Sequence, residues 1–117
     1  MRYFETIFLE EANDFIAKLE PKLSRKVLYH IDLAEQTNDV SFFKKLQNDI
    51  WEFRTGYSGL QIRLLAFWDK ICNHRTLVIA THGFFKKSKK TPAKEINKAA
   101  ILRKEYMKHK KSEGSYG

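Results

Sequence analysis

Apolar and polar residues change their spacing several times along the chain, and each change predicts a new element. The aromatic and β-branched run from Arg2 to Leu9 predicts a strand. Helical spacing of apolar residues follows from Glu10 to Leu19 and again from Pro21 to Ala34. Pro21 separates the two helices, because the residue before a proline avoids the helical conformation and proline itself suits the first helical turn. These segments predict a helical hairpin.

The second half of the chain shows the alternating pattern that is typical of strands. Alternation predicts strands over Ile50–Arg54, Leu60–Trp68 and Arg75–Phe85, joined by turn residues at 56–59 and a polar connection at 69–74. Links this short favour an antiparallel meander, since a parallel crossover needs a dozen or more residues. The apolar patch just before these strands predicts only a helical turn or a linker; it consists of Phe42, Phe43 and Leu46.

A last helix is predicted after Thr91, which can cap it, and Pro92, which suits its first position. From Lys108 to Gly117 the chain offers little to bury, and we expect a basic, disordered tail there. The order strand, two helices, three strands, helix predicts an α+β fold in one domain over residues 1–107. In that fold a small antiparallel sheet packs on helices.

The charge balance narrows the range of partners. The 117 residues include 22 Lys and Arg against 14 Asp and Glu, which gives a formal net charge of +8. On a small domain such a charge favours an anionic partner, namely nucleic acid, a membrane surface or an acidic protein. No apolar run reaches the roughly 18 residues of a membrane span. The N-terminus lacks the layout of a signal peptide. We therefore expect a cytoplasmic protein without a membrane partner.

Neither the cysteine nor the histidines indicate a cofactor. The one cysteine, Cys72, excludes an intrachain disulfide and fits a reducing compartment. An inert side chain is favoured over a catalytic thiol at this position. The four histidines lack the paired spacing of metal ligands; they are His30, His74, His82 and His109. We expect no metal and no cofactor.

Polar residues on the three predicted strands form a candidate nucleic-acid face. If the strand registers agree, Arg54, Arg63, His82 and Lys86 share one open side of the sheet, and the aromatic side packs on the helices. Glu52 and Gln61 lie on the same side of their strands as these arginines. In the last strand, strict alternation places one set of residues on a common face: Val78, Ala80, His82 and Phe84.

Such a face suits RNA cleavage without a metal, which needs a base for the 2′-hydroxyl, cations for the phosphorane and an acid for the leaving oxygen. Arg54 and Arg63 fit the charge role, because guanidinium binds phosphate bidentately and stays protonated. His82 can act as acid or base near neutral pH. Lys86 can do so only if neighbouring cations lower its pKa.

The segment after the last strand supplies further candidate contacts to nucleic acid, as positive charges and stacking faces. The candidates there and on the neighbouring strand are Lys87, Lys89, Lys90, Phe84 and Gln61. Alternative interpretations remain open. The lysines can form a merely solvated loop, Arg54 and Glu52 a simple charge pair, and His82 a structural residue at a bend. Of Phe84 and Phe85, at most one can be a stacking platform, the other being part of the core.

Two sequence strings with Arg63 between them carry a family resemblance. Trp51 to Arg54 reads WEFR, and His82 to Pro92 reads HGFFKKSKKTP. Together, over about residues 46–106, they resemble the phage-derived HigB-like branch of the RelE/ParE toxin superfamily. The resemblance implies a RelE-like fold and the toxin of a type II toxin–antitoxin pair. Its partner would be an antitoxin of the helix-turn-helix type, encoded alongside, which covers the basic surface in a hetero-oligomer.

The resemblance also implies an activity. RelE and HigB members of the superfamily are mRNA endoribonucleases that act on the translating ribosome without a metal, whereas ParE members inhibit DNA gyrase. A protein that binds only its antitoxin is a third alternative. By position, Arg63 would contact phosphate, and Lys86 and Lys87 would form the basic end of the last strand. The chain lacks the tyrosine or aspartate that some relatives carry before the last helix, so His82 is the substitute candidate for the general acid.

Overall fold

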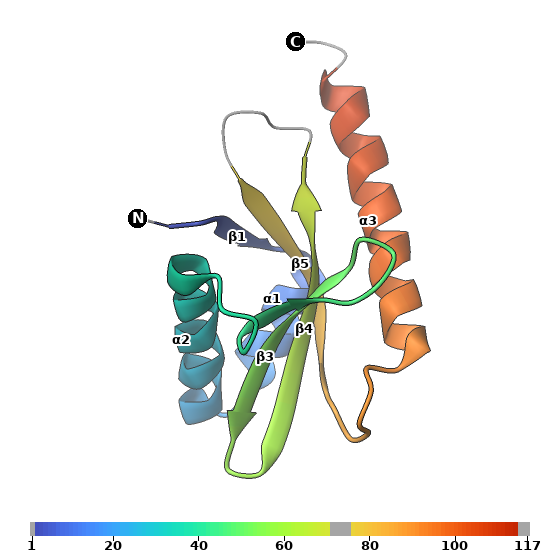
Figure 1. Cartoon of the computed structure of the whole chain (residues 1–117). Coiled ribbons are helices and arrows are strands. Elements are labelled where there is room, and N and C mark those ends of the chain that lie inside the picture. Colours follow the sequence, from blue (N-terminus) through green and yellow to red (C-terminus); the bar gives the residue numbers. More distant parts are fainter. Residues whose placement is uncertain (1, 71–75, 115–117) are drawn as a thin grey trace.

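The computed structural model describes residues 2–70 and 76–114 (Figure 1). Its elements follow one another in the order β1 (Glu5–Phe8), α1 (Glu10–Lys18), α2 (Pro21–Thr37), β2 (Phe43–Lys45), β3 (Trp51–Tyr57), β4 (Leu60–Asp69), β5 (Leu77–Phe85) and α3 (Ala93–Gly114). The predicted α+β fold is confirmed, with one strand more than expected. Cys72 and His74 lie outside the described residues.

All the strands belong to one five-stranded sheet, in the order β1-β5-β4-β3-β2. The meander of β3, β4 and β5 is antiparallel, as predicted. β1, however, pairs parallel with β5, Glu5 opposite Leu77 and Phe8 opposite Ala80, so the sheet is mixed. The parallel pair is possible because the helical hairpin and the other strands supply the long connection that it needs.

The segment expected as a helical turn or linker contains the extra strand, β2, which is the edge strand beside β3. Phe43 opens this strand and is 1% exposed. Its ring stacks on Phe53 and on Trp51, with centroid separations of 4.5 and 4.9 Å. Three residues are too few to show a period. The burial of one aromatic ring against β3 fixes the conformation instead.

Helices cover both faces of the sheet (Figure 1). α1 and α2 lie on one face, over a core to which Val27, Leu64 and Ala80 contribute. α3 lies on the other face, over a smaller cluster that includes Leu65, Ile79 and Ile96. The face predicted to be open is therefore partly covered by α3. Within residues 2–70 and 76–114, no helix combines the length and the apolar composition of a membrane span.

A β-bulge in β5 changes which residues share a face. Leu65 of β4 pairs with His82, but the next residue, Ala66, pairs with Ala80. The register therefore shifts by one residue, and Thr81 is the extra residue. Val78 and Ala80, before the bulge, pack with the α1 and α2 core. Phe84, after it, packs on the α3 side, and His82 bonds to α3 there. The common face derived from strict alternation is therefore wrong, and the bulge brings His82 to the face of the arginines.

α3 differs from its prediction at both ends. It begins at Ala93, and the carbonyl of Pro92 accepts bonds from the first turn, so that proline precedes the helix. The helix continues to Gly114, which means that residues 108–114 are helical and the expectation of a disordered tail is wrong for them. Along its length the Tyr106 hydroxyl donates to Asp69 Oδ2 at 2.5 Å, which ties α3 to the end of β4.

Candidate nucleic-acid interface

Two arginines face one another across the central strands. Arg54 on β3 is directly opposite Arg63 on β4. Like charges in this position destabilise a sheet unless something neutralises them. Glu52 lies beside both, with its carboxylate oxygens 3.8 Å from Arg54 Nε and 3.6 Å from Arg63 Nε. One buried carboxylate between two guanidinium groups leaves an excess of positive charge.

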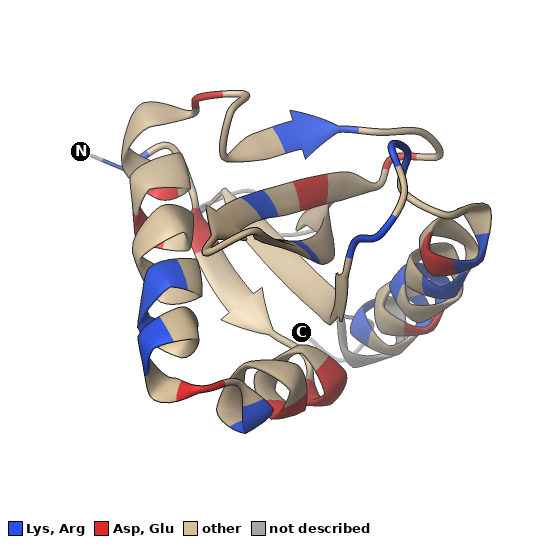
Figure 2. Ribbon diagram, turned by 90° about the horizontal axis from the view of Figure 1, so that it is seen from below, with Lys and Arg blue, Asp and Glu red and all other residues tan. Residues whose placement is uncertain are grey.

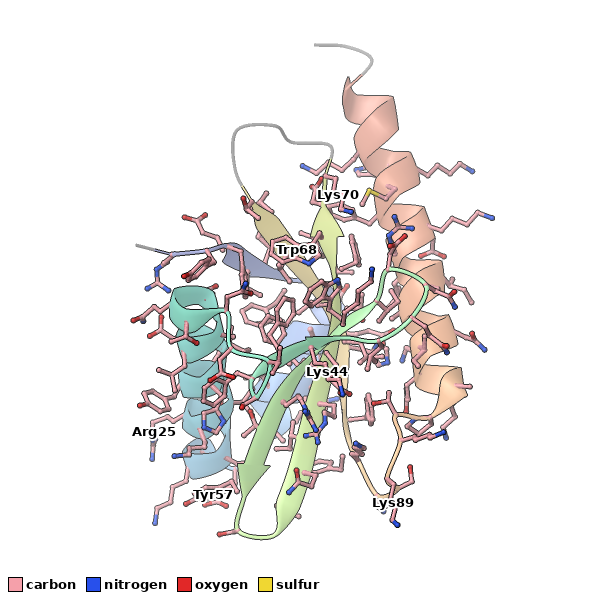
Figure 3. All side chains as sticks on the ribbon, viewed as in Figure 1. Arg25, Lys44, Tyr57, Trp68, Lys70 and Lys89 are labelled. Carbon is pink, nitrogen blue, oxygen red and sulfur yellow. The ribbon has the colours of Figure 1, made fainter. Side chains whose placement is uncertain are left out.

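A basic pocket of about 350 Å³ lies on the same face of the sheet. Five cations line it, together with the carboxylate of Glu52: Lys44, Arg54, Lys86, Lys89 and Lys90. In Figure 2 the blue segments of β2 and of the loop before α3 lie toward one another. Figure 3 labels one lysine in each segment, Lys44 in β2 and Lys89 in the loop. The pocket thus combines charges from β2, β3 and the loop after β5.

Thr91 connects the lysine-rich loop to the floor of the basic pocket. Its hydroxyl donates to Glu52 Oε1 at 2.5 Å. This side chain was predicted to cap the last helix, but the helix begins two residues later, at Ala93, and the hydroxyl binds Glu52. Because Thr91 directly follows Lys89 and Lys90 in sequence, the bond holds these lysines against β3. Glu52 therefore positions cations from three elements.

Lys86 lies at the junction of β5 and the basic pocket. Its backbone N–H donates to the carbonyl of Gln61 at 2.7 Å, which continues the ladder between β4 and β5. Burial lowers the pKa of Lys86, as do the charges of Arg63, Arg54 and Lys44, while Glu52 opposes the shift. A lysine with a lowered pKa has a larger neutral fraction, which proton transfer requires.

The Arg63 guanidinium points along β4 and not into the basic pocket. Nη1 donates to the carbonyl of Ile62 at 2.9 Å, and Nη2 lies 3.5 Å from Gln61 Oε1. Arg63 lines a second pocket, of about 290 Å³, which Arg54 and Gln61 also line. Burial lowers the pKa of Arg63, and Glu52 opposes this effect. The guanidinium remains protonated at neutral pH.

His82 shares the face of the arginines but is separate from the basic pocket. It is 3% exposed beneath α3. Nε2 lies 3.1 Å from Glu95 Oε1, and Nδ1 lies 2.9 Å from Thr81 Oγ1. Burial lowers the pKa of His82 against the opposing hydrogen bond to Glu95. Both ring nitrogens are engaged within the protein, which favours the structural interpretation of this residue.

The aromatic candidates also lie outside the basic pocket. Phe84 packs into the cluster beneath α3. Phe85 is exposed on the opposite face, where its ring lies 5.6 Å from that of Phe15, centroid to centroid. Lys87 is exposed, whereas Lys89 and Lys90 line the pocket. The structure therefore groups Arg54, Lys86, Lys89 and Lys90, places Arg63 and Gln61 next to them, and separates the other candidates.

Three residues of the interface were not predicted as site residues. Lys44 was missed because β2 was not expected to be a strand, so nothing placed its side chains on a face. Thr91 was assigned to the helix cap. Glu52 was considered only as a charge partner of Arg54, although its position in the alternating WEFR string already put it on their face. In the described part of the chain, no group of three or more His, Cys, Asp or Glu side chains can hold a metal ion.

The stability of the protein is expected to fall as the pH drops below about 6.5, the ordinary pKa of histidine. In that range an unfolded His82 binds a proton and the folded one, with its lowered pKa, does not, so protons favour the unfolded state. His82→Gln should reduce the loss of Tm between pH 7 and pH 5.5, measured by circular dichroism.

His30→Gln is a parallel variant, because burial and Lys26 lower the pKa of His30 in the same direction. Each variant should remove its own share of the pH dependence. An unchanged slope of Tm against pH in His82→Gln would show that His82 does not titrate in this range.

Comparisons with known proteins bear on the fold and the family of the chain. The chain has no significant match among curated proteins. Among solved structures it is similar to a chain in the crystal structure of the toxin–antitoxin complex RelBE2 from Mycobacterium tuberculosis, with 19% identity and a TM-score of 0.55 over 71% of this chain and 98% of that one. This likeness confirms the RelE-like fold. The family described as phage-derived protein Gp49-like matches residues 14–104, most of the chain, as the predicted phage-derived branch implies. The chain belongs to this Gp49-like family.

Proposed function

We propose that the protein is the toxin of a type II toxin–antitoxin pair and a metal-independent endoribonuclease that cleaves mRNA on the translating ribosome. One observation carries the proposal: Arg54 and Arg63 lie opposite each other with a single buried carboxylate between them, beside a pocket that holds four lysines. Fixed cations in a partly dehydrated site stabilise a phosphorane more than they stabilise the ground-state phosphate. The RelE-like fold supports the proposal by analogy only.

In this mechanism the scissile phosphate lies where the two pockets meet, between Arg54, which lines both, and Arg63, which lines the second pocket. Lys89 and Lys90 bind phosphates beside it. The neutral fraction of Lys86, which the lowered pKa enlarges, accepts the proton of the 2′-hydroxyl as its oxygen forms a bond to phosphorus. The bond from phosphorus to the 5′ oxygen then breaks, and that oxygen takes a proton from water. The products are a 2′,3′-cyclic phosphate and a 5′-hydroxyl. His82 is given no proton to carry, since it anchors α3 to β5.

The proposed partner is an antitoxin of the helix-turn-helix type encoded alongside. An acidic segment of such a protein fits the basic pocket for the same electrostatic reason as RNA does. In the resulting hetero-oligomer the five cations of the pocket would be neutralised and inaccessible to mRNA.

A second candidate is a non-catalytic inhibitor of DNA gyrase. The burial of His82 favours this second candidate, because the side chain whose ordinary pKa best suits proton transfer near neutral pH is then absent from the surface. A protein that binds only an antitoxin would likewise need no proton carrier.

Inducible expression, combined with mapping of mRNA 5′ ends, tests the proposal. We expect growth to stop and new 5′ ends to appear within translated regions, and we expect Lys86→Ala to lower the cleavage at least tenfold. The matched control is Lys22→Ala, which removes the same charge from an exposed position on α2. Intact mRNA with DNA damage would identify a gyrase inhibitor, and normal growth would leave antitoxin binding as the function.

A further inference from the structure

We propose that the second pocket is a subsite for one unpaired nucleobase of the bound RNA; this inference rests on the proposed function. The pocket lies beyond the end of β2, where β3 continues past its pairing with Phe43. Its volume of about 290 Å³ is open to solvent between α2, the loop before β2 and the hairpin of β3 and β4. Figure 3 labels Tyr57 at the end of this hairpin.

Arg54 joins the two pockets, since it lines both. A phosphate held by Arg54 in the basic pocket is one sugar away from its own base. That base can therefore reach the second pocket while the phosphate stays in place. The second pocket has two cationic lining residues, Arg54 and Arg63, and no acidic one, which suits a ligand attached to a polyanion.

An aromatic pair forms one wall of the pocket. The rings of His30 and Phe42 lie 5.1 Å apart, centroid to centroid, at an interplanar angle of 33°. Burial and Lys26 lower the pKa of His30, so its ring is uncharged at neutral pH. An uncharged aromatic wall beside two guanidinium groups is the combination on which unpaired bases stack in proteins that bind single-stranded nucleic acid.

The hairpin contributes polar groups suited to the edge of a base. The Gln61 side chain lies over Gly56, where an added Cβ would come within 3.2 Å of its Nε2. The absence of a side chain at Gly56 therefore lets the amide cross the ladder, and this amide offers both a donor and an acceptor. His30 Nδ1, in the aromatic wall, is buried without a hydrogen-bond partner among the described residues. Such an unsatisfied group is uncommon in folded proteins and marks a place where a polar ligand can add a bond.

Binding of a labelled single-stranded RNA to the purified full chain, measured by fluorescence anisotropy, tests the subsite. Phe42→Leu keeps an apolar side chain but removes the ring, and it should weaken RNA binding about 5- to 100-fold. Its affinity for inorganic tripolyphosphate, which has charge but no base, should stay within about twofold. Phe85→Leu is the matched control, because it removes an exposed ring that lines neither of the two pockets and should leave both affinities unchanged.

Gln61→Ala provides a second variant with little risk to folding, because Gln61 is exposed. It should change the relative affinities for oligomers of single base types. RNA of the same length with abasic positions should bind the parent protein as weakly as ordinary RNA binds Phe42→Leu. Thermal unfolding of each variant checks that the fold is retained.

The outcomes distinguish this subsite from the proposed activity. If the parent cleaves mRNA in cells and Phe42→Leu binds RNA as the parent does, the subsite is wrong and the activity stands. If Phe42-dependent RNA binding occurs without cleavage, the subsite holds and the endoribonuclease proposal fails. Loss of binding to an acidic peptide in Phe42→Leu, with RNA binding unchanged, would assign the pocket to a protein partner and overturn the proposal.

Discussion

Arg63→Ala is expected to lower mRNA cleavage at least 100-fold and to relieve growth inhibition while the protein still folds. The side chain supplies one of the two guanidinium groups that stabilise the phosphorane, and the loss of one such fixed donor costs about 100- to 1,000-fold in rate. The Tm should fall, because Glu52 loses a buried partner and packing is lost around a side chain that is 4% exposed. Relief of the repulsion from Arg54 on the opposite strand offsets part of this loss.

The measurement is cleavage at mapped mRNA 5′ ends, together with growth after induction and co-purification with the antitoxin. Arg63→Lys is the informative control, since it keeps the charge but loses the planar fork, and it should give an intermediate rate. A variant Arg63→Ala that remains as toxic as the parent would show that the opposed arginines are not the active site.

Glu52→Gln is expected to destabilise the protein by about 3 kcal/mol, because removal of one partner leaves the buried charge of Arg63 uncompensated. The amide can still accept the bond from Thr91, so the change acts mainly through charge. The same substitution should tighten RNA binding, because the variant pocket has no carboxylate to repel phosphate. Stability and RNA affinity therefore change in opposite directions.

Thermal unfolding with and without inorganic tripolyphosphate separates these effects. The anion should raise the Tm of Glu52→Gln by more than that of the parent, since it takes the place of the missing carboxylate and binds only the folded state. Glu11→Gln is the matched control: its ion pair with Lys98 is exposed, and its loss should change stability by less than about 1 kcal/mol. Equal stabilisation of parent and Glu52→Gln by the anion would show that Glu52 does not occupy an anion site.

The trade between stability and binding explains why one carboxylate lies among so many cations. With the pocket empty, Glu52 holds Arg54, Arg63 and the loop of Thr91 together. When an anion binds, it competes for the same guanidinium groups. Glu52 keeps these cations in place while the pocket is empty, and phosphate can still displace it. Cations that are already in place stabilise the transition state without having to reorganise.

Local sequence patterns determined much of this protein. Alternation in Trp51–Arg54 and Leu60–Trp68 set which side of each strand carries the arginines, because successive side chains on a strand point to opposite faces. The turn at 56–59 joined the two strands closely enough to fix their pairing, so Arg54 and Arg63 were correctly expected on one face. Pro21 likewise separated the two helices as predicted.

Contacts between residues distant in sequence decided the rest. The burial of Phe43 against Phe53 makes β2 a strand and brings Lys44 to the basic pocket, and no period in three residues could reveal it. The bulge at Thr81 resets the pleat, so the face of His82 could not follow from alternation alone. Thr91 does not cap α3 because the helix begins two residues later, at Ala93, and its hydroxyl donates to the buried carboxylate of Glu52. α3 then covers His82. Periodicity reports the face of a residue within one element, and only packing between elements decides what that face meets.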